Sequence, residues 1–348
     1  TRREFLGLAA GAVAAAALAG CRRGRAFSDT EKVIALGIDG MDPVLLRRFM
    51  DEGRMPNCRR LAEQGSFLPL RTSDPPQSPV AWSNFISGTN PGGHGIFDFI
   101  ARDPATMKPH FSLASVESPK RTMRLGQLTV PLSGARVENL RKGPVFWADL
   151  EEHGVPCTVI RVPANFPPTK TTAKTLSGLG TPDVRGTYGI FSFFTDNEDE
   201  TTRDLAGGHI EKIAIRNGQA ECLLEGPQDP SGSGKAGIVP FRVLVDAVSP
   251  VAKIMIQKNE FVLKEGEWSG WVPMSFPMPG ALQGVSAMCR FFLKSVRDDF
   301  ELYVSPVNMD PLDPALPIST PSSYSRELTQ AVGRFYTQGI AEDTKALS

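Results

Sequence analysis

The chain has 348 residues, of which 41% are hydrophobic and 22% charged, a composition typical of a globular protein and not of a disordered one. Its 38 Lys and Arg residues balance its 38 Asp and Glu residues, so no basic excess is present to hold a nucleic acid backbone. The length allows two domains, or one domain with a large insertion, and an acidic substrate would need local binding groups such as a metal or helix N-termini.

Residues 1–21 resemble a twin-arginine export signal that ends in a lipoprotein box. Arg2 and Arg3 precede an Ala-, Gly- and Leu-rich run, which is too short and too rich in small residues for a comfortable membrane span. Cleavage at Leu18-Ala19-Gly20-Cys21 would leave Cys21 as a lipid-modified first residue. We expect a protein exported in the folded state and anchored through Cys21 on the periplasmic or extracellular face of a bacterial membrane.

The start of the mature chain has the pattern of an α/β domain. Lys32–Gly40 (KVIALGIDG) is a short apolar run with β-branched residues, which predicts a buried parallel strand. Two helical patterns follow, the first with Asp42 as N-cap and a proline in its first turn, and Ser66–Arg71 is the next expected strand. Pro144–Pro168 repeats the order helix, then strand. This alternation predicts a doubly wound, mainly parallel sheet.

The pattern changes near Gly186, where apolar and polar residues begin to alternate with period two. Asn217-Gly218 between two alternating arms predicts a hairpin turn. We expect an inserted antiparallel β unit over residues 186–306, between the first part of the α/β core (22–185) and a return to that core (307–348). A helix is expected over Ser325–Gln338.

Two residues stand where this architecture would place a site. Asp39 ends a predicted strand, and ligands bind at the carboxyl ends of parallel strands. Ser78 precedes Pro79 and an apolar segment, which predicts Ser78 as the N-cap of a helix. The helix dipole favours an anion there but cannot ionise a serine at neutral pH, whereas a metal ion could activate the hydroxyl. A nucleophile at Ser78 therefore needs a cation, and Asp39 is its natural first ligand.

The stretches IALGIDGMDP, SPVAWSNFISGTNPGGHGIFDF, VPANFPP and LSGLGTPDVRGTYGIFSFFT together resemble the alkaline phosphatase superfamily, in its type I phosphodiesterase/nucleotide pyrophosphatase branch. The resemblance implies an alkaline-phosphatase-like fold, with Asp39 as a metal ligand and Ser78 as the nucleophile that becomes phosphorylated. It also implies two divalent ions, usually zinc, and a small phosphoester substrate.

Some positions depart from the family pattern. Ala81 stands where nucleotide pyrophosphatases have an Asn, which weakens the case for a nucleotide substrate, and Trp82 breaks the sulfatase pattern. Arg185, in GTPDVRG, suits a bidentate phosphate contact, although a turn with an ordinary salt bridge is the favoured interpretation.

The Asp-His pair that is one of the later metal-binding motifs of the family does not occur in this sequence. His94 is expected to be structural, and the three other histidines, His110, His153 and His209, are expected to be solvated or at helix ends. We therefore expect a fragment of a longer protein that is inactive alone.

Other features of the sequence are expected to be structural. Trp82, Phe85 and Phe97 are predicted to belong to the core, and Trp268 and Trp271 to be hairpin aromatics. Four cysteines are widely spaced without a C-x-x-C pair, which favours free thiols over a zinc knuckle or a dense disulfide frame: Cys58, Cys157, Cys222 and Cys289.

The sequence thus predicts a metal-dependent, phosphodiesterase-like hydrolase of phosphoric esters. A non-catalytic surface lipoprotein that binds a partner is an alternative. Another is a different superfamily activity: a phosphomonoesterase, phosphomutase or sulfatase.

Overall fold

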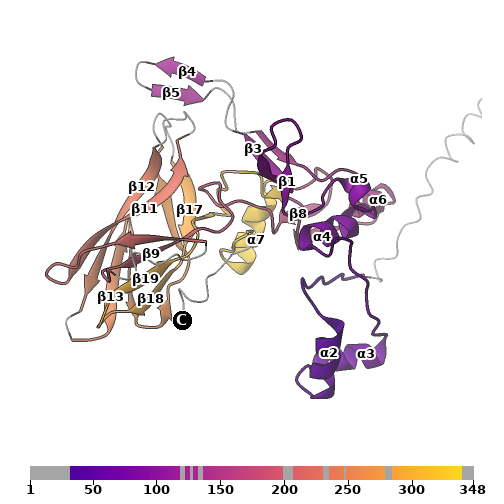
Figure 1. The fold of residues 1–348 in the computed structure, drawn as a ribbon, viewed down its shortest axis with the longest axis horizontal. Helices are drawn as coiled ribbons and strands as arrows, with labels where there is room; N and C mark the ends of the chain where they lie inside the picture. Colours follow the sequence, from indigo (N-terminus) through magenta and orange to yellow (C-terminus); the bar gives the residue numbers. More distant parts are fainter. Residues whose placement is uncertain are drawn as a thin grey trace, which may run out of the picture.

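The computed structural model describes residues 32–117, 122–125, 128–131, 136–198, 207–229, 235–246, 248–278 and 284–338. The predicted export signal and lipoprotein box, with Cys21, lie outside these residues. Figure 1 shows a β-rich unit on one side, the helices α4, α5 and α6 on the other, and α7 between them. None of the helices in the described ranges is long and apolar enough to span a membrane.

The first two predicted helices are confirmed as α2 (Pro43–Asp51) and α3 (Pro56–Gln64). Asp42 caps α2 as expected, since its Oδ1 accepts hydrogen bonds from the backbone N–H groups of Val44 (2.7 Å) and Leu45 (2.8 Å). These two donors have no partner inside the helix, so the cap satisfies them.

The two strands predicted around these helices are wrong for this structure. Lys32–Gly40 and Ser66–Arg71 are extended or turn segments that pair with no described strand. Val33 is 95% exposed and Leu70 93%, so their apolar side chains lie outside any core. A strand forms only where neighbouring strands satisfy its backbone groups, and the described residues place none beside these two runs.

Short elements follow. Helix α4 (Ser78–Ser87) ends at Gly88, whose φ of 65° is the left-handed conformation that favours glycine, and α5 (Pro91–His94) comes next. Three two-stranded antiparallel sheets then form from β1 with β2, β3 with β6, and β4 with β5. Their bounds are β1 (Ile100–Arg102), β2 (Pro109–Phe111), β3 (Ala114–Glu117), β4 (Thr122–Leu125), β5 (Leu128–Pro131) and β6 (Arg136–Asn139).

The predicted helix-then-strand unit is confirmed as α6 (Phe146–Glu152) followed by β7 (Thr158–Val162). Strand β7 pairs in parallel with β8 (Lys174–Ser177), and β21 (Ser319–Thr320) extends this sheet antiparallel to β8. The expected C-terminal helix is α7 (Tyr324–Val332), which ends six residues before the predicted boundary, at Gly333. The protein is therefore a mixed α/β protein whose sheets contain parallel strands.

The β unit packs two sheets face to face, with a third, smaller sheet beside them. One sheet has the order β10-β9-β19-β18-β15, the second β11-β12-β13-β14, and the third β16-β17-β20. The bounds are β9 (Phe191–Thr195), β10 (Gly208–Lys212), β11 (Gln219–Gln228), β12 (Ala236–Val245), β13 (Val251–Ile256), β14 (Asn259–Lys264), β15 (Glu267–Trp268), β16 (Val272–Phe276), β17 (Val285–Cys289), β18 (Phe291–Ser295), β19 (Glu301–Val304) and β20 (Asn308–Met309).

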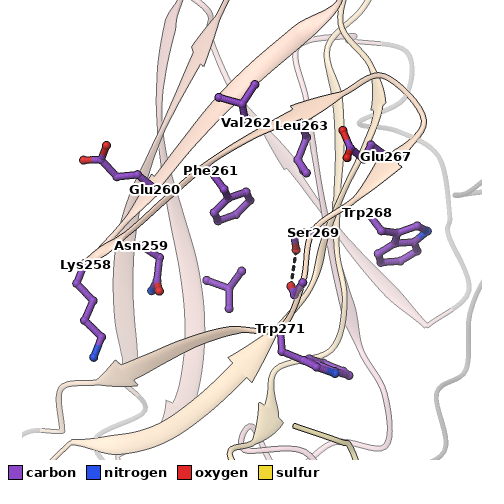
Figure 2. Close-up of a pocket in the computed structure, with 12 residues that line it drawn as sticks. Lys258, Asn259, Glu260, Phe261, Val262, Leu263, Glu267, Trp268, Ser269 and Trp271 are labelled. Carbon is purple, nitrogen blue, oxygen red and sulfur yellow. Dashed lines mark hydrogen bonds between the residues drawn. The ribbon is translucent and has the colours of Figure 1, made fainter. Parts of the chain in front are cut away.

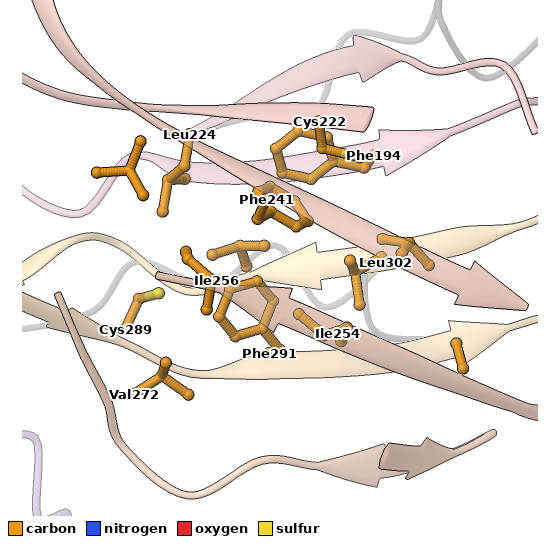
Figure 3. Packing of buried hydrophobic residues seen from close by; sticks show 14 of the residues in the cluster. Phe194, Cys222, Leu224, Phe241, Ile254, Ile256, Val272, Cys289, Phe291 and Leu302 are labelled. Carbon is orange, nitrogen blue, oxygen red and sulfur yellow. The ribbon is translucent and has the colours of Figure 1, made fainter. Parts of the chain in front are cut away.

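The largest hydrophobic core lies between these sheets (Figure 3). Alternate residues of β11 and β12 point inward, as period-two patterning predicts. The rings of Phe241 and Phe291 meet edge to face, with centroids 5.6 Å apart, and link the two layers.

The turn at Asn217-Gly218 is confirmed, but its predicted first arm is not. Both residues have positive φ, and Arg216 and Gln219 exchange backbone hydrogen bonds of 2.8 and 3.0 Å. The segment before the turn does not pair with β11, because β10 instead runs parallel to β9 and β11 pairs with the ten-residue strand β12. The unit is therefore antiparallel except for the β9–β10 pair.

Candidate functional site

Asp39 and Ser78 lie side by side although 39 residues separate them in the sequence. The Ser78 hydroxyl donates a hydrogen bond to Oδ1 of Asp39, with Oγ and Oδ1 3.2 Å apart. Asp39 is exposed and Ser78 half-buried, so the pair opens to solvent and a ligand can reach it.

Helix α4 positions the hydroxyl. The N-cap is Gln77, without a side-chain cap, and Ser78 is the first helical residue, so the prediction that Ser78 is the N-cap was wrong by one position. Pro79 occupies the second helical position, where its missing N–H costs no intrahelical hydrogen bond. The Ser78 side chain still lies at the end of the helix where unpaired N–H groups and the helix dipole favour negative charge.

Trp82 is the third member of the site. It lies one helical turn after Ser78, and its indole Nε1–H donates to the same Asp39 oxygen over 3.3 Å. Trp82 is half-buried, and its ring packs on Gly37. The sequence pattern predicted a core position for Trp82, whereas the structure places its indole N–H on Asp39. The one sequence signal that could have placed Trp82 in the site was its i+4 spacing from Ser78, which puts both side chains on one face of α4.

The other aromatic residues predicted to be core are exposed. Phe85 is 48% exposed and Phe97 58%, so the prediction was wrong for both. Phe85 meets Trp82 and Phe146 edge to face, with centroids 5.9 and 5.3 Å apart. Apolar spacing on a helix does not say whether another layer covers that face.

His94 is structural, as predicted. It is fully buried, its Nε2 lies 2.6 Å from the side-chain amide of Asn84, and its Nδ1 accepts from the Ile96 backbone N–H over 3.1 Å. Burial lowers the pKa of His94, and the nearby positive charge of Arg141 lowers this pKa further. The enclosed His94 ring thus links α4 to the segment that follows α5 and helps to fix the end of α4.

Arg185 forms an ion pair with Glu225 of the β unit. Its Nη2 lies 3.1 Å from Oε2 of Glu225, and its side chain is only 14% exposed. Neighbouring Asp183 is buried and accepts hydrogen bonds from the backbone N–H and hydroxyl of Thr187. Burial raises the pKa of Asp183, although those hydrogen bonds and Arg185 oppose the rise. This geometry favours the salt-bridge interpretation of the GTPDVRG stretch over a phosphate contact.

The described side chains do not by themselves form a complete metal centre. In the part of the chain that the structure describes, no three His, Cys, Asp or Glu residues gather closely enough to hold an ion. Asp39 and Ser78 supply one carboxylate and one hydroxyl, fewer than the four or more ligands of a protein-bound divalent ion. Among the other histidines, His153 ends α6 and His209 lies beside Glu211 in β10.

A pocket of about 510 Å³ lies in the β unit and not around Ser78. Its lining runs from Lys258 to Leu263 and from Glu267 to Val272, and Figure 2 shows the rings of Phe261 and Trp271 on opposite sides. Trp268, at its rim, packs on Phe292 and Tyr303, with centroids 5.0 and 5.6 Å apart, which agrees with a structural aromatic residue. This pocket holds no nucleophile beside a base.

The comparison with protein families bears on the Ser78 site. The model of the family described as type I phosphodiesterase/nucleotide pyrophosphatase matches residues 33–212, which include both Asp39 and Ser78. The chain belongs to this family. Comparison with curated proteins and with solved structures gives no match.

Membership in the type I phosphodiesterase/nucleotide pyrophosphatase family, part of the alkaline phosphatase superfamily, indicates a hydrolase of phosphoester bonds. The family is generally metal-dependent. The match includes α2 to β10 and leaves most of the β unit outside, so the family says nothing about the role of that unit.

Proposed function

We propose that this protein is a phosphodiesterase-like hydrolase in which Ser78 is the nucleophile. Ser78 Oγ attacks phosphorus, the Oγ–P bond forms as the bond to the leaving oxygen breaks, and Asp39 Oδ1 is placed to accept the serine proton. The leaving alkoxide takes a proton from solvent. Water then cleaves the Oγ–P bond, which restores Ser78 and releases the phosphoryl product.

The observation that supports this proposal is the Ser78–Asp39 contact at the N-terminus of α4. A hydroxyl beside a carboxylate, at a helix end that favours anions, is an arrangement suited to phosphoryl transfer. Both residues fall within the family match. The motifs around them resemble those in which the family has its metal-binding Asp and its nucleophile, which supports the proposal.

The described residues supply only part of a metal site. Asp39 is the described carboxylate placed to bind one of two divalent ions, with zinc the first expectation, but the described residues do not complete such a site. We assign no step to a metal. We infer that further ligands come from polypeptide outside the described residues, together with the remainder of a doubly wound sheet, and that the 348-residue chain alone is inactive.

The test is hydrolysis of bis-p-nitrophenyl phosphate by the product of the complete gene and by the 348-residue chain. Ser78→Ala should abolish turnover by the gene product, and an intact-mass measurement should find a phosphoryl adduct on wild type only. Ser87→Ala, on the last residue of the same helix, is the matched control and should retain activity. The p-nitrophenyl monoester and sulfate, assayed in parallel, separate a diesterase from the other superfamily activities.

Equal rates for wild type and Ser78→Ala would refute the nucleophile. If neither the gene product nor its Ser78→Ala variant hydrolyses any of these substrates, a non-catalytic binding lipoprotein is the better interpretation.

We also propose export by the twin-arginine route and a lipid anchor on Cys21. The paired arginines and the lipoprotein box support this proposal. Cys21→Ala should release the protein from the membrane fraction, and a variant that stays membrane-bound would contradict the anchor.

A further inference from the structure

The segment that carries Asp39 has few contacts with the rest of the described structure. Residues 32–41 form no helix or strand, and Val33 and Ile34 are 95% and 89% exposed. No backbone hydrogen bond joins residues 32–41 to another described part of the chain. Side-chain contacts must therefore determine where Asp39 lies.

Those contacts converge on one face of α4. Ser78 and Trp82 are four residues apart, so their side chains lie on the same side of the helix. Both donate to Asp39 Oδ1, over 3.2 Å from the hydroxyl and 3.3 Å from the indole. Within the described residues the second oxygen, Oδ2, accepts no hydrogen bond, so it remains available to another group.

Trp82 also holds the segment by packing. Its ring occupies the space over Gly37, where an added Cβ would overlap ring atoms Cη2 and Cζ3. Gly37 does not have a positive φ, so the close approach of the ring, and not the backbone conformation, requires glycine here.

We propose that Trp82 is a positioning residue: its ring on Gly37 and its indole N–H on Asp39 hold residues 37–39 against α4 and set the Asp39 carboxylate beside Ser78. The consequence for catalysis rests on the proposed function, whereas the structural role does not.

Two substitutions separate the two contacts. Trp82→Phe keeps an aromatic ring near Gly37 and removes the N–H donor. Gly37→Ala keeps the donor and displaces the ring, which can move because Trp82 is only half-buried. If Trp82 positions Asp39, both variants should have the same defect.

The first measurement is the ¹H–¹⁵N spectrum of the 348-residue chain, which has four tryptophans. The Trp82 indole resonance is assigned by its loss in Trp82→Phe. It should shift in Asp39→Ala and in Gly37→Ala and stay in place in Asp42→Ala, which removes a nearby carboxylate that caps α2 instead. If the chemical shift of the Trp82 indole resonance does not change in either Asp39→Ala or Gly37→Ala, the proposal is wrong. This result does not depend on whether the chain hydrolyses anything.

The second measurement uses the active gene product. Trp82→Phe should lower kcat about tenfold with KM unchanged, the loss expected for about one charged hydrogen bond. Gly37→Ala should have the same effect, and Trp271→Phe in the β unit should have none. Wild-type kcat in Trp82→Phe would refute a catalytic consequence, whereas loss of activity in Ser78→Ala alone would leave the proposed function intact.

Discussion

Gly226→Ala tests whether the sheets of the β unit pack in the register that the structure shows. Gly226 is buried in β11, where the pairing with β12 shifts between Glu225 and Gln228. A Cβ at this position would lie 2.5 Å from Cε1 and Cγ of Phe276 and closer still to Cδ1. Phe276 is fully buried in the largest core, so its ring has little room to move.

The expected cost is that of overpacking a filled core, about 1–3 kcal/mol. For a unit of about 120 residues, about 2 kcal/mol corresponds to a fall in Tm of roughly 8 °C. The assay is thermal unfolding followed by circular dichroism, with urea unfolding as a second measure. Gly208→Ala should behave similarly, because its Cβ would meet the ring of fully buried Phe191 in the other sheet.

Gly270→Ala is the matched control. Gly270 does not have a positive φ, and nothing lies within 4 Å of an added Cβ, so the variant should match or slightly exceed wild type in Tm. If Gly226→Ala were as stable as Gly270→Ala, Gly226 would not face Phe276, and the proposed packing of β11 on β16 would be wrong.

Two further predictions follow from local features. Asp42→Ala removes the acceptor for the Val44 and Leu45 amides and should destabilise α2 by about 1 kcal/mol. We expect faster hydrogen exchange at these two amides and no change in the Tm of the β unit. Unchanged exchange would contradict the cap. Burial raises the pKa of Cys222 to about 12 and also raises the pKa of the fully buried Cys289 thiol. At pH 8 both thiols should therefore resist a thiol reagent until the protein unfolds. The half-buried Cys58 thiol should react at once. Rapid labelling of Cys222 and Cys289 in the folded state would refute this burial.

Local signals in the sequence were sufficient for several elements. The Asp42-Pro43 pair predicted the start of α2 because a cap needs only residues within one turn. The Asn217-Gly218 turn followed from the backbone conformations that these two residues tolerate. The motifs around Asp39 and Ser78 also indicated the family, which the match over residues 33–212 shows.

Pairing and burial were decided only by the tertiary structure. Lys32–Gly40 has the composition of a buried strand, yet it is exposed because no described strand lies beside it. The arm before Asn217 pairs with β9 instead of β11, a choice between two distant partners that alternation cannot make. The site shows the same division. The sequence predicted Asp39 and Ser78 separately, but only the folded chain shows that Asp39 meets both Ser78 and Trp82. A contact across 39 residues depends on how the chain packs and not on local propensity.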